Sequence, residues 1–587
     1  MDIDFNVADH RYSGKQSLTY TNHSPDTLTR VFYHLFYNAF QPGSAMYTMH
    51  RNVADPDHRL LQIALLPPED QGYLKVSSLQ QDGTTVKYHE DGTILEVDLV
   101  KPLLPGESTR LDMEFNGQVP VLVRRAGRNN SEGISYSMAQ WYPKLCAYDA
   151  DGWHPNPYLG YEFYGDFGDF DVKIMIDRKY ILGATGILKN ADVIGCGYEQ
   201  EGSAISQPGT DRLTWHFVAK NVHDFAWAAD PEYTHQRFRR ADGIEVHYLF
   251  QKNEFTADAW AKLPAIMDFV FDFLNTYYGR YPYPVYSFIQ AGDGGMEYPM
   301  ATLITGHRSL EGLVGVAVHE LIHSWYHGVI ATNELRAAWM DEGFTNYLTA
   351  ITMRAIREKG LLPPVESLRS FENDYKNYIQ LTKLGLEEPL STHANHFKTT
   401  TAYYASAYSK GCVFLAQLEY VLGEELMQQI MLRYFNTWKF RHPSPLDFIR
   451  VAEKESGFVL DWYYEYWVLS TKTIDYAISS VEEMDGATHV TIARKGQIPM
   501  PLELNIRTKR GQVLHYYIPL NLMRGNKRQT PGEEWVILED WVATSPQYEF
   551  TLPVRQAQVV EIQIDPSGKM ADVQRANNIY APDATTD

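Results

Sequence analysis

The motif H-E-x-x-H at residues 319–323 constrains this chain more than any other feature of its sequence. Residues four positions apart lie one turn apart on one face of an α-helix, so His319 and His323 can bind the same metal ion. Glu320 follows the first histidine, where its carboxylate can reach a water molecule on the metal without binding the metal itself. The motif therefore predicts a helix that carries two ligands of a zinc ion. The alternative is a surface helix with a chance pair of histidines.

A third ligand is needed, because catalytic zinc ions are held by three protein side chains and keep a fourth position open. The candidate is Glu342 in the segment W-M-D-E-G-F, which begins a second helical pattern. Packing of the two helices against each other would bring this carboxylate to the metal. The second pattern rests on the apolar residues Phe344, Tyr347, Leu348 and Ile351.

Two further residues near the motif have open interpretations. His327 continues the series of histidines, but the helical rise places it about 12 Å from His319, too far to bind the same ion. We interpret His327 as a core histidine or as one that supports a ligand from behind. Asp341, which precedes Glu342, either supports a ligand in the same way or is a solvated acid. Val329 occupies the place of the third histidine in the other zinc-binding arrangement, which is therefore excluded.

The length of 587 residues is too great for one core and predicts three or four domains. No apolar run has the length needed to cross a bilayer, and the first residues, M-D-I-D-F-N-V, lack the basic and apolar segments of a signal peptide. We therefore expect a soluble chain without a signal or transmembrane segment. It would be periplasmic or secreted if a leader was removed and cytoplasmic otherwise, and the sequence does not decide between these compartments.

Charge and cysteine content narrow the possible partners. The chain has 52 basic and 73 acidic residues, a formal net charge of −21, which argues against nucleic acid or an anionic membrane as a partner. The three cysteines, Cys146, Cys196 and Cys412, are far apart and odd in number. They predict free thiols rather than a disulfide framework or a thiolate metal site.

The period of apolar residues changes twice along the chain. Residues 1–230 and 473–587 show the two-residue period of half-buried strands, which predicts an N-terminal antiparallel β-sheet domain and a C-terminal β-sandwich. Residues 231–472 show a helical period and contain the metal motif. The fold class is therefore multidomain α+β. Long helical patterns cover 312–328, 342–358 and 408–437, and a further stripe is formed by Leu263, Met267, Val270 and Leu274.

Two more segments bring chemically useful side chains. Upstream of the metal motif, residues 292–300 read G-D-G-G-M-E-Y-P-M, a glycine-rich turn that can approach a ligand and present the carboxylate of Glu297. Downstream, residues 407–415 read A-Y-S-K-G-C-V-F-L and begin a helix with Tyr408 near its first turn, where a phenol could donate to an oxyanion. Taken alone, Glu297 could be an exposed acid at a strand end, and Tyr408 could be a packing residue.

Read together, these segments resemble the gluzincin zinc aminopeptidases of the aminopeptidase N type. The resemblance rests on H-E-x-x-H followed after eighteen residues by Glu342, on G-x-M-E before it and on Y-S-K-G after it. It extends to W-A-A-D-P at 227–231 and to I-D-P-S-G-K-M-A-D at 564–572. It implies an N-terminal β saddle, a thermolysin-like, mainly helical catalytic domain and a C-terminal β-sandwich, without the large helical domain that follows in many relatives.

The resemblance also implies roles for individual residues. The zinc ligands, for one Zn²⁺ per chain, are His319, His323 and Glu342. The general base is Glu320, and Tyr408 stabilises the oxyanion. Glu297 anchors the free α-amine of the substrate, and the other expected substrate-binding residues are Gly294, Gly295, Met296 and, on the first domain, Gln140 in M-A-Q-W-Y-P.

This chain departs from the family pattern at two places. Tyr298 replaces the asparagine that usually follows the glutamate of G-x-M-E-N. After His323 the chain reads S-W-Y-H-G, with His327, where the family commonly has Q-W-F-G-N. Both departures concern local contacts with the substrate rather than the zinc chemistry.

The expected function is hydrolysis of the N-terminal peptide bond of peptides with a free N-terminus, by a zinc-activated water and a glutamate general base. One alternative is a zinc endopeptidase or related hydrolase with the same metal centre, against which the Glu297 motif speaks. The other is a non-catalytic scaffold with a structural zinc, although structural sites close all four positions with protein groups. The preferred N-terminal residue, the natural substrates and the oligomeric state are not readable from the sequence.

Overall fold

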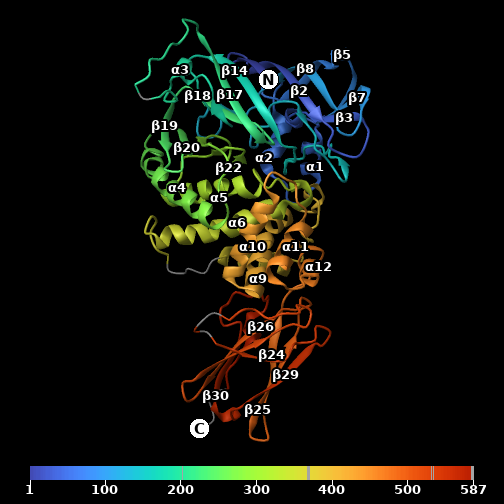
Figure 1. Ribbon diagram of the computed structural model, residues 1–587, viewed down its shortest axis with the longest axis vertical. Coiled ribbons are helices and arrows are strands. Elements are labelled where there is room, and N and C mark those ends of the chain that lie inside the picture. Colours follow the sequence, from blue (N-terminus) through green and yellow to red (C-terminus); the bar gives the residue numbers. More distant parts are fainter. Residues whose placement is uncertain (201, 366–370, 530–531, 533, 583–587) are drawn as a thin grey trace.

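The computed structural model of this chain describes all residues except 201, 366–370, 530–531, 533 and 583–587. It is an elongated molecule with N-terminal sheets at one end, a helical block in the middle and C-terminal sheets at the other end (Figure 1). The expected multidomain α+β fold is confirmed. Within the described residues, no helix combines the length and the hydropathy required to cross a membrane.

The N-terminal layer is built around one long sheet. Its strands pair antiparallel, as expected, except for β1 and β14, which are parallel. The sheet order is β16 (Ile187–Leu188), β17 (Arg212–Val222), β14 (Gly168–Asp177), β1 (Asp2–Asn6), β2 (Arg11–Thr21), β8 (Ser108–Gln118), β4 (Tyr73–Gln81) and β5 (Thr84–Thr85).

Smaller elements complete this layer. The first small sheet contains β15 (Ile181–Ala184), β18 (Trp227–Asp230), β10 (Tyr136–Met138) and β9 (Gly127–Arg128). The second contains β11 (Lys144–Leu145), β3 (Leu28–His34), β7 (Ile94–Leu103) and β6 (Lys87–Asp91). The remaining elements are the hairpin β12 (Tyr148–Asp149) and β13 (Gly152–Trp153) and the helices α1 (Ala45–Asn52), α2 (His58–Leu61) and α3 (Ala191–Ile194).

The middle block contains a five-stranded sheet that the helical period did not predict. Strands β20, β21 and β23 are parallel, and β19 and β22 flank them antiparallel. Every residue of β21 is buried, so this strand is a continuous buried run without the two-residue alternation. The order is β19 (Tyr233–Arg239), β20 (Glu245–Gln251), β21 (Val285–Gln290), β23 (Ala301–Ile304) and β22 (Gly295–Tyr298).

The helices follow this sheet, and most begin or end a few residues away from the predicted limits. The pattern at 408–437 is interrupted at Gly423, whose φ of 96° ends one helix before the next begins. The helices are α4 (Ala257–Tyr277), α5 (Leu310–Tyr326), α6 (Glu334–Glu358), α7 (Glu372–Leu384), α8 (Thr400–Tyr404), α9 (Gly411–Leu422), α10 (Glu424–Trp438), α11 (Pro445–Ser456) and α12 (Asp461–Val468).

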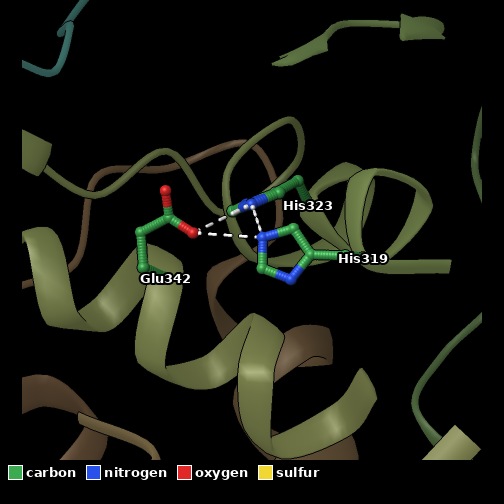
Figure 2. A group of neighbouring side chains, drawn as sticks. All are labelled: His319, His323 and Glu342. Atoms are coloured by element: carbon green, nitrogen blue, oxygen red, sulfur yellow. Dashed lines mark hydrogen bonds and ion pairs between the residues drawn. The ribbon is translucent and has the colours of Figure 1, made fainter. Parts of the chain in front are cut away.

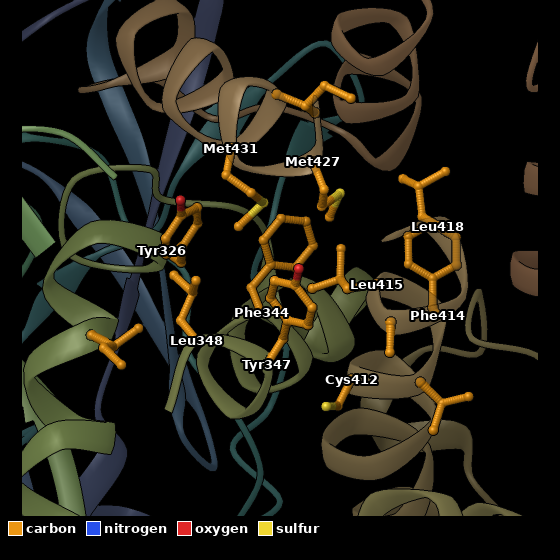
Figure 3. Close-up of a cluster of buried hydrophobic side chains, with 14 of the residues drawn as sticks. Tyr326, Phe344, Tyr347, Leu348, Cys412, Phe414, Leu415, Leu418, Met427 and Met431 are labelled. Atoms are coloured by element: carbon orange, nitrogen blue, oxygen red, sulfur yellow. The ribbon is translucent and has the colours of Figure 1, made fainter. Parts of the chain in front are cut away.

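Helices α5, α6, α9 and α10 contribute side chains to one buried core, part of which is drawn in Figure 3. The ring of Phe344, on α6, packs edge to face on Phe448 at a centroid distance of 4.9 Å. Each fully buried side chain of this size contributes roughly 1.5–3 kcal/mol of hydrophobic stabilisation, so the helices are held firmly. The side chains labelled in Figure 3 are Tyr326, Phe344, Tyr347, Leu348, Cys412, Phe414, Leu415, Leu418, Met427 and Met431.

Helices α6 and α9 touch through their backbones. A Cβ atom added to Gly343 would lie 2.6 Å from the Cα and carbonyl carbon of Gly411, a distance that real Cβ contacts do not reach. Glycine at this position therefore allows the two helices to approach closely. The approach brings the beginning of α9 against Glu342, the residue that precedes Gly343.

The C-terminal layer consists of two sheets, and it docks on the helical block. Tyr516 of β27 and Phe550 of β29 contact each other across the two sheets, at a centroid distance of 5.9 Å. The carbonyl oxygen of Lys569 accepts hydrogen bonds from Tyr375 and Gln417. The sheets are β24 (Tyr476–Met484), β25 (Ala487–Arg494) and β29 (Gln547–Leu552), and β28 (Val536–Ile537), β27 (Val513–Ile518), β26 (Leu502–Thr508), β30 (Val559–Ile564) and β31 (Ile579–Tyr580).

The glycine contact gives a prediction about stability. Gly343→Ala should destabilise the fold by about 1–3 kcal/mol, because the added methyl group overpacks the crossing of α6 and α9. The matched control is Gly315→Ala on α5, where an added Cβ has no atom within 4 Å. Thermal unfolding followed by circular dichroism should show a lower midpoint for Gly343→Ala and an equal or higher one for Gly315→Ala. An unchanged midpoint for Gly343→Ala would show that the crossing is not tight.

Candidate active site

Three predicted metal ligands converge from α5 and α6 (Figure 2). His319 and His323 lie one turn apart on α5, and their Nε2 atoms are 3.2 Å apart. Oε2 of Glu342, on α6, lies 3.2 Å from Nε2 of His319 and 3.4 Å from Nε2 of His323. Helical spacing thus sets the first pair of ligands, and packing of α6 on α5 adds the third.

The donor atoms fit a zinc ion. Ligands with zinc bonds of about 2.0–2.1 Å at tetrahedral corners lie about 3.3–3.4 Å apart, close to the three distances between these atoms. Two imidazole nitrogens and one carboxylate oxygen are a donor set used by catalytic zinc sites. The side chain of His319 is 17% exposed, whereas that of His323 is 1% exposed, so the cluster is more accessible on the His319 side.

The ring of His323 is fixed from behind by α6. Its Nδ1 lies 2.5 Å from Oδ1 of Asp341 and 3.2 Å from Oγ1 of Thr345. Asp341 is fully buried, so its interpretation as a solvated acid is wrong. A carboxylate on the far nitrogen of a ligand histidine orients the ring and leaves the other nitrogen free for metal.

Glu320 points into the site and is almost completely buried. Its Oε2 atom has no hydrogen-bond partner within the described part of the chain. Burial raises the pKa of Glu320, and the nearby charge of Glu297 raises it further. A Cβ atom on Gly295 would lie 2.0 Å from Oε1 of Glu320, so glycine at this position leaves the carboxylate its present place against strand β22.

Glu297 lies on β22 and is 6% exposed, so the interpretation as an exposed acid at a strand end is wrong. Its Oε1 is 3.9 Å from Nδ1 of His323, and oxygens of Glu297 and Glu320 lie within 4.8 Å of each other. Among the described residues, no hydrogen-bond donor is paired with its carboxylate. The site therefore holds a buried acid without a hydrogen-bond donor beside the predicted metal ligands.

Neighbours in the same motif anchor its backbone. The carbonyl oxygen of Gly294 accepts hydrogen bonds from the backbone and side chain of Thr305, at 2.8 and 3.1 Å. Met296 is buried, and its carbonyl oxygen accepts from the hydroxyl of Thr302 at 3.0 Å. These bonds hold β22 against β23 and fix the direction of Glu297.

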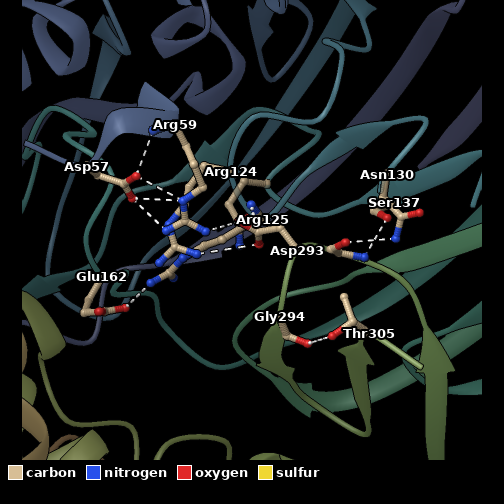
Figure 4. A network of polar contacts seen from close by, with 12 residues as sticks. Asp57, Arg59, Arg124, Arg125, Asn130, Ser137, Glu162, Asp293, Gly294 and Thr305 are labelled. Carbon is tan, nitrogen blue, oxygen red and sulfur yellow. Dashed lines mark hydrogen bonds and ion pairs between the residues drawn. The ribbon is translucent and has the colours of Figure 1, made fainter. Parts of the chain in front are cut away.

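The loop before Glu297 is clamped by the N-terminal layer (Figure 4). Asp293 accepts from Nη1 of Arg59 at 2.7 Å and from the backbone N–H of Arg125 at 2.9 Å, and Nη1 of Arg124 lies 3.6 Å away. The side chain of Asn130 donates to the carbonyl oxygen of Gly292 at 2.9 Å. Sequence analysis missed this clamp, because its partners are distant in sequence and belong to no motif.

Tyr408 lies in a π-helical turn, η4 (Ala405–Lys410), between α8 and α9. This differs from the predicted first turn of a helix, because the helical segment begins at Thr400. The phenol donates to Oε1 of Glu342, and its ring is parallel to that of His319 at a centroid distance of 6.2 Å. Burial and the charge of Glu342 raise the pKa of Tyr408, so the hydroxyl remains a proton donor.

Gln140 contacts Tyr298, the residue of the G-G-M-E-Y motif that departs from the family pattern. The hydroxyl of Tyr298 donates to Oε1 of Gln140 at 3.1 Å, while Nε2 of Gln140 has no partner within the described residues. Gln140 is buried, and it lines the same small cavity as Glu297. The structure thus brings the two expected amine-binding residues to one place, with Tyr298 between them.

His327 is buried, which agrees with its interpretation as a core histidine. It follows the last residue of α5, and its Nδ1 contacts Oε1 of Glu334 at the start of α6. Its ring also meets the ring of His223 at a centroid distance of 4.5 Å. Burial lowers the pKa of His327 to about 4.

Comparison with known families agrees with this geometry. Residues 266–467, which include α5, α6 and Tyr408, match the model of the peptidase family M1 domain. This segment is similar to that domain. The predicted resemblance to aminopeptidases of the N type is confirmed for it.

The three cysteines are free, also as predicted.

Curated relatives are similar to part of this chain. Aminopeptidase N of Mus musculus is 23% identical over 250 residues, which cover 39% of this chain and 25% of that protein. A leukotriene A-4 hydrolase homolog of Botryotinia fuckeliana is 28% identical over 165 residues, 26% of this chain and 24% of that protein. The matched part therefore spans about a quarter of the length of these relatives.

Solved structures share the fold over most of the chain. A point mutant of an M1 zinc metallopeptidase from Deinococcus radiodurans superposes with a TM-score of 0.55 at 17% identity. The superposition covers 80% of this chain and 92% of that chain. A second structure of this mutant, bound to a Tyr-Ser-Ala substrate, gives a TM-score of 0.54 at 18% identity, with coverage of 80% and 93%.

The contact behind His323 gives a prediction about metal affinity. Asp341→Ala should weaken binding of the most tightly held zinc ion by about 10–100-fold, because the ring of His323 loses its orienting carboxylate. Competition with a chelating dye measures this constant. Thr345→Val removes only the longer contact to the same nitrogen and should have a smaller effect. Equal affinities of Asp341→Ala and the unaltered chain would contradict the assigned role.

Proposed function

We propose that this chain is a zinc-dependent aminopeptidase, which hydrolyses the N-terminal peptide bond of peptides with a free N-terminus. One observation carries the proposal. The buried carboxylate of Glu297, which has no hydrogen-bond partner among the described residues, lies beside three converging metal ligands. A buried acid of this kind calls for a cation, and the α-ammonium group of a peptide is a cation at a fixed distance from the bond to be cleaved.

His319, His323 and Glu342 would hold one catalytic zinc ion. Such an ion polarises the scissile carbonyl and activates a water molecule for attack at neutral pH. Glu320 accepts the proton of the attacking water and delivers it to the leaving amine. Its free and buried Oε2 atom supports this role, because no other group of the described chain occupies it.

Binding of the substrate amine sets where the peptide is cut. Glu297 forms an ion pair with the ammonium group, and the side-chain oxygen of Gln140 adds a second acceptor from the N-terminal layer. Gly294, Gly295 and Met296 place β22 so that Glu297 faces the site. Because the ammonium group is fixed, only the first peptide bond reaches the attacking water, and one residue is released at a time.

Tyr408 stabilises the oxyanion that forms during attack. Its hydroxyl, which now donates to Glu342, lies at the ligand cluster and stays protonated because the phenol is buried and its pKa is raised. In the tetrahedral intermediate it donates to the substrate oxygen instead. The names of the relatives support this reaction class, since they include aminopeptidase N and an M1 zinc metallopeptidase bound to Tyr-Ser-Ala.

The decisive experiment compares amino acid p-nitroanilides with a free amine and the same compounds with an acetylated amine. The free amines should be cleaved, the acetylated ones should not, and a chelator should abolish cleavage until zinc is restored. Glu297→Gln should lower kcat/KM for free amines about 10- to 100-fold, since hydrogen bonds between charged groups contribute roughly 1.5–3 kcal/mol. Equal cleavage of acetylated substrates would move the assignment to a zinc endopeptidase. No zinc-dependent cleavage at all would leave a non-catalytic zinc scaffold.

A second prediction concerns the oxyanion. Tyr408→Phe should lower kcat by about 10²–10³, the usual cost of losing one oxyanion donor. Tyr404→Phe is the matched control, because its ring lies 5.9 Å from that of Tyr408 and its hydroxyl makes no hydrogen bond among the described residues. Steady-state kinetics on the preferred p-nitroanilide gives both values. A similar small loss in both variants would exclude Tyr408 from the chemical step.

A further inference from the structure

Behind the zinc ligands lies a second group of side chains of the kind that bind metals. It consists of Glu297, His327, Glu334 and Asp341, and one ligand atom from each lies within 4.8 Å of the others. All four residues are buried, with exposed fractions of 6%, 7%, 0% and 0%. We call this group the rear cluster.

The rear cluster is assembled at the junction of three elements. Glu297 comes from β22, His327 caps the end of α5, and Glu334 and Asp341 lie in the first turns of α6. The backbone N–H of Phe163, from the N-terminal layer, donates to Oε2 of Glu334 at 3.1 Å and fixes its direction. The opposite oxygen, Oε1, is thereby turned toward His327.

Within the described part of the chain, the rear cluster has more than one oxygen without a hydrogen-bond donor, among them those of the Glu297 carboxylate and Oδ2 of Asp341. Oδ1 of Asp341 is bonded to His323, but Oδ2 is buried and has no hydrogen-bond partner within the described part of the chain. An unsatisfied carboxylate oxygen in a fully buried residue costs free energy unless a ligand meets it. This atom points to a group that binds here in addition to the protein side chains.

Within the described part of the chain, the carboxylates of the rear cluster form ion pairs only with imidazoles: Asp341 and Glu297 with His323, and Glu334 with His327. Three of its four residues are carboxylic acids. Among the described residues, no lysine or arginine forms an ion pair with any of them. Lys144 lines the neighbouring cavity, but its Nζ is paired with Asp224 at 2.8 Å. Buried carboxylates whose only ion-pair partners are imidazoles can still take up a proton or bind a cation.

A small cavity borders this cluster. Its walls include Glu297, His327 and Glu334, together with Gln140 and Tyr298. Its free space of about 10 Å³ is enough for one particle of the size of a water molecule. A single metal ion therefore fits, whereas an amino acid side chain does not.

We propose that the rear cluster is a second cation site, which binds a divalent transition-metal ion such as Zn²⁺ or Mn²⁺. Its donors are one imidazole nitrogen and carboxylate oxygens, a set that both ions accept. The hydrogen bond between His323 and Asp341 connects it to the first site. Because Glu297 belongs to the rear cluster and to the proposed amine anchor, an ion bound there would compete with the ammonium group of a substrate.

The test is a count of bound metal ions that does not depend on activity. The full chain is stripped with a chelator, equilibrated with Zn²⁺ or with Mn²⁺, freed of excess metal by gel filtration and analysed by plasma mass spectrometry. The unaltered chain should retain two ions and Glu334→Gln one, because the amide still accepts from Phe163 but binds cations weakly. His327→Asn provides a second variant of the same site and should also retain one ion.

Two controls separate this proposal from the function proposed above. Glu419→Gln changes another buried glutamate, which is paired with Tyr347 and Lys569, and should retain two ions. His319→Ala removes the first site only and should retain one ion at the rear cluster. One ion in the unaltered chain, or two ions in both rear-cluster variants, would overturn the second site. Loss of activity with an unchanged ion count would instead concern the catalytic assignment.

Discussion

The close contact between Gly343 of α6 and Gly411 of α9 is the constraint on which the site depends. With no side chain between them, the two helices approach until their backbones touch. Glu342 then faces the ligand histidines on α5, and the π-helical turn before α9 brings Tyr408 onto the same carboxylate. In the proposed site, one oxygen of this carboxylate would bind the metal while the other accepts the hydrogen bond of the tyrosine.

On the other side of the site, a second glycine also allows two elements to approach closely. Strand β22 lies close against the carboxylate of Glu320 at Gly295, which has no Cβ, and this closeness brings Glu297 near the proposed general base. The outcome is a buried region with several acids around few protein cations. Such a region is unstable by itself, and a bound metal ion and a substrate ammonium group are the natural way to neutralise it.

Local features were predictable from the sequence and long-range ones were not. The spacing of the motif predicted that His319 and His323 share a helix face. The helical pattern that begins in W-M-D-E-G-F made Glu342 the candidate for the third ligand, and the family resemblance then implied the same residue. Strand β21 was not predicted, because it is buried on both faces and its sequence shows no alternation of apolar and polar residues. The π-helical turn at Tyr408 leaves no distinct period, and the partners Arg59 and Asp293 are 234 residues apart. The exact domain limits at 230 and 472 remain predictions.

The clamp on Asp293 has a mechanical consequence. By sequence, the strand that carries Glu297 belongs to the middle block, but Arg59, Arg124 and Asn130 tie the preceding loop to the N-terminal layer. Glu342 and the histidines, in contrast, are anchored in the helices. A hinge motion between the two layers would therefore change the distance between the proposed amine anchor and the proposed metal ligands. In the proposed function, the relative position of two domains would then determine which peptide bond is cleaved.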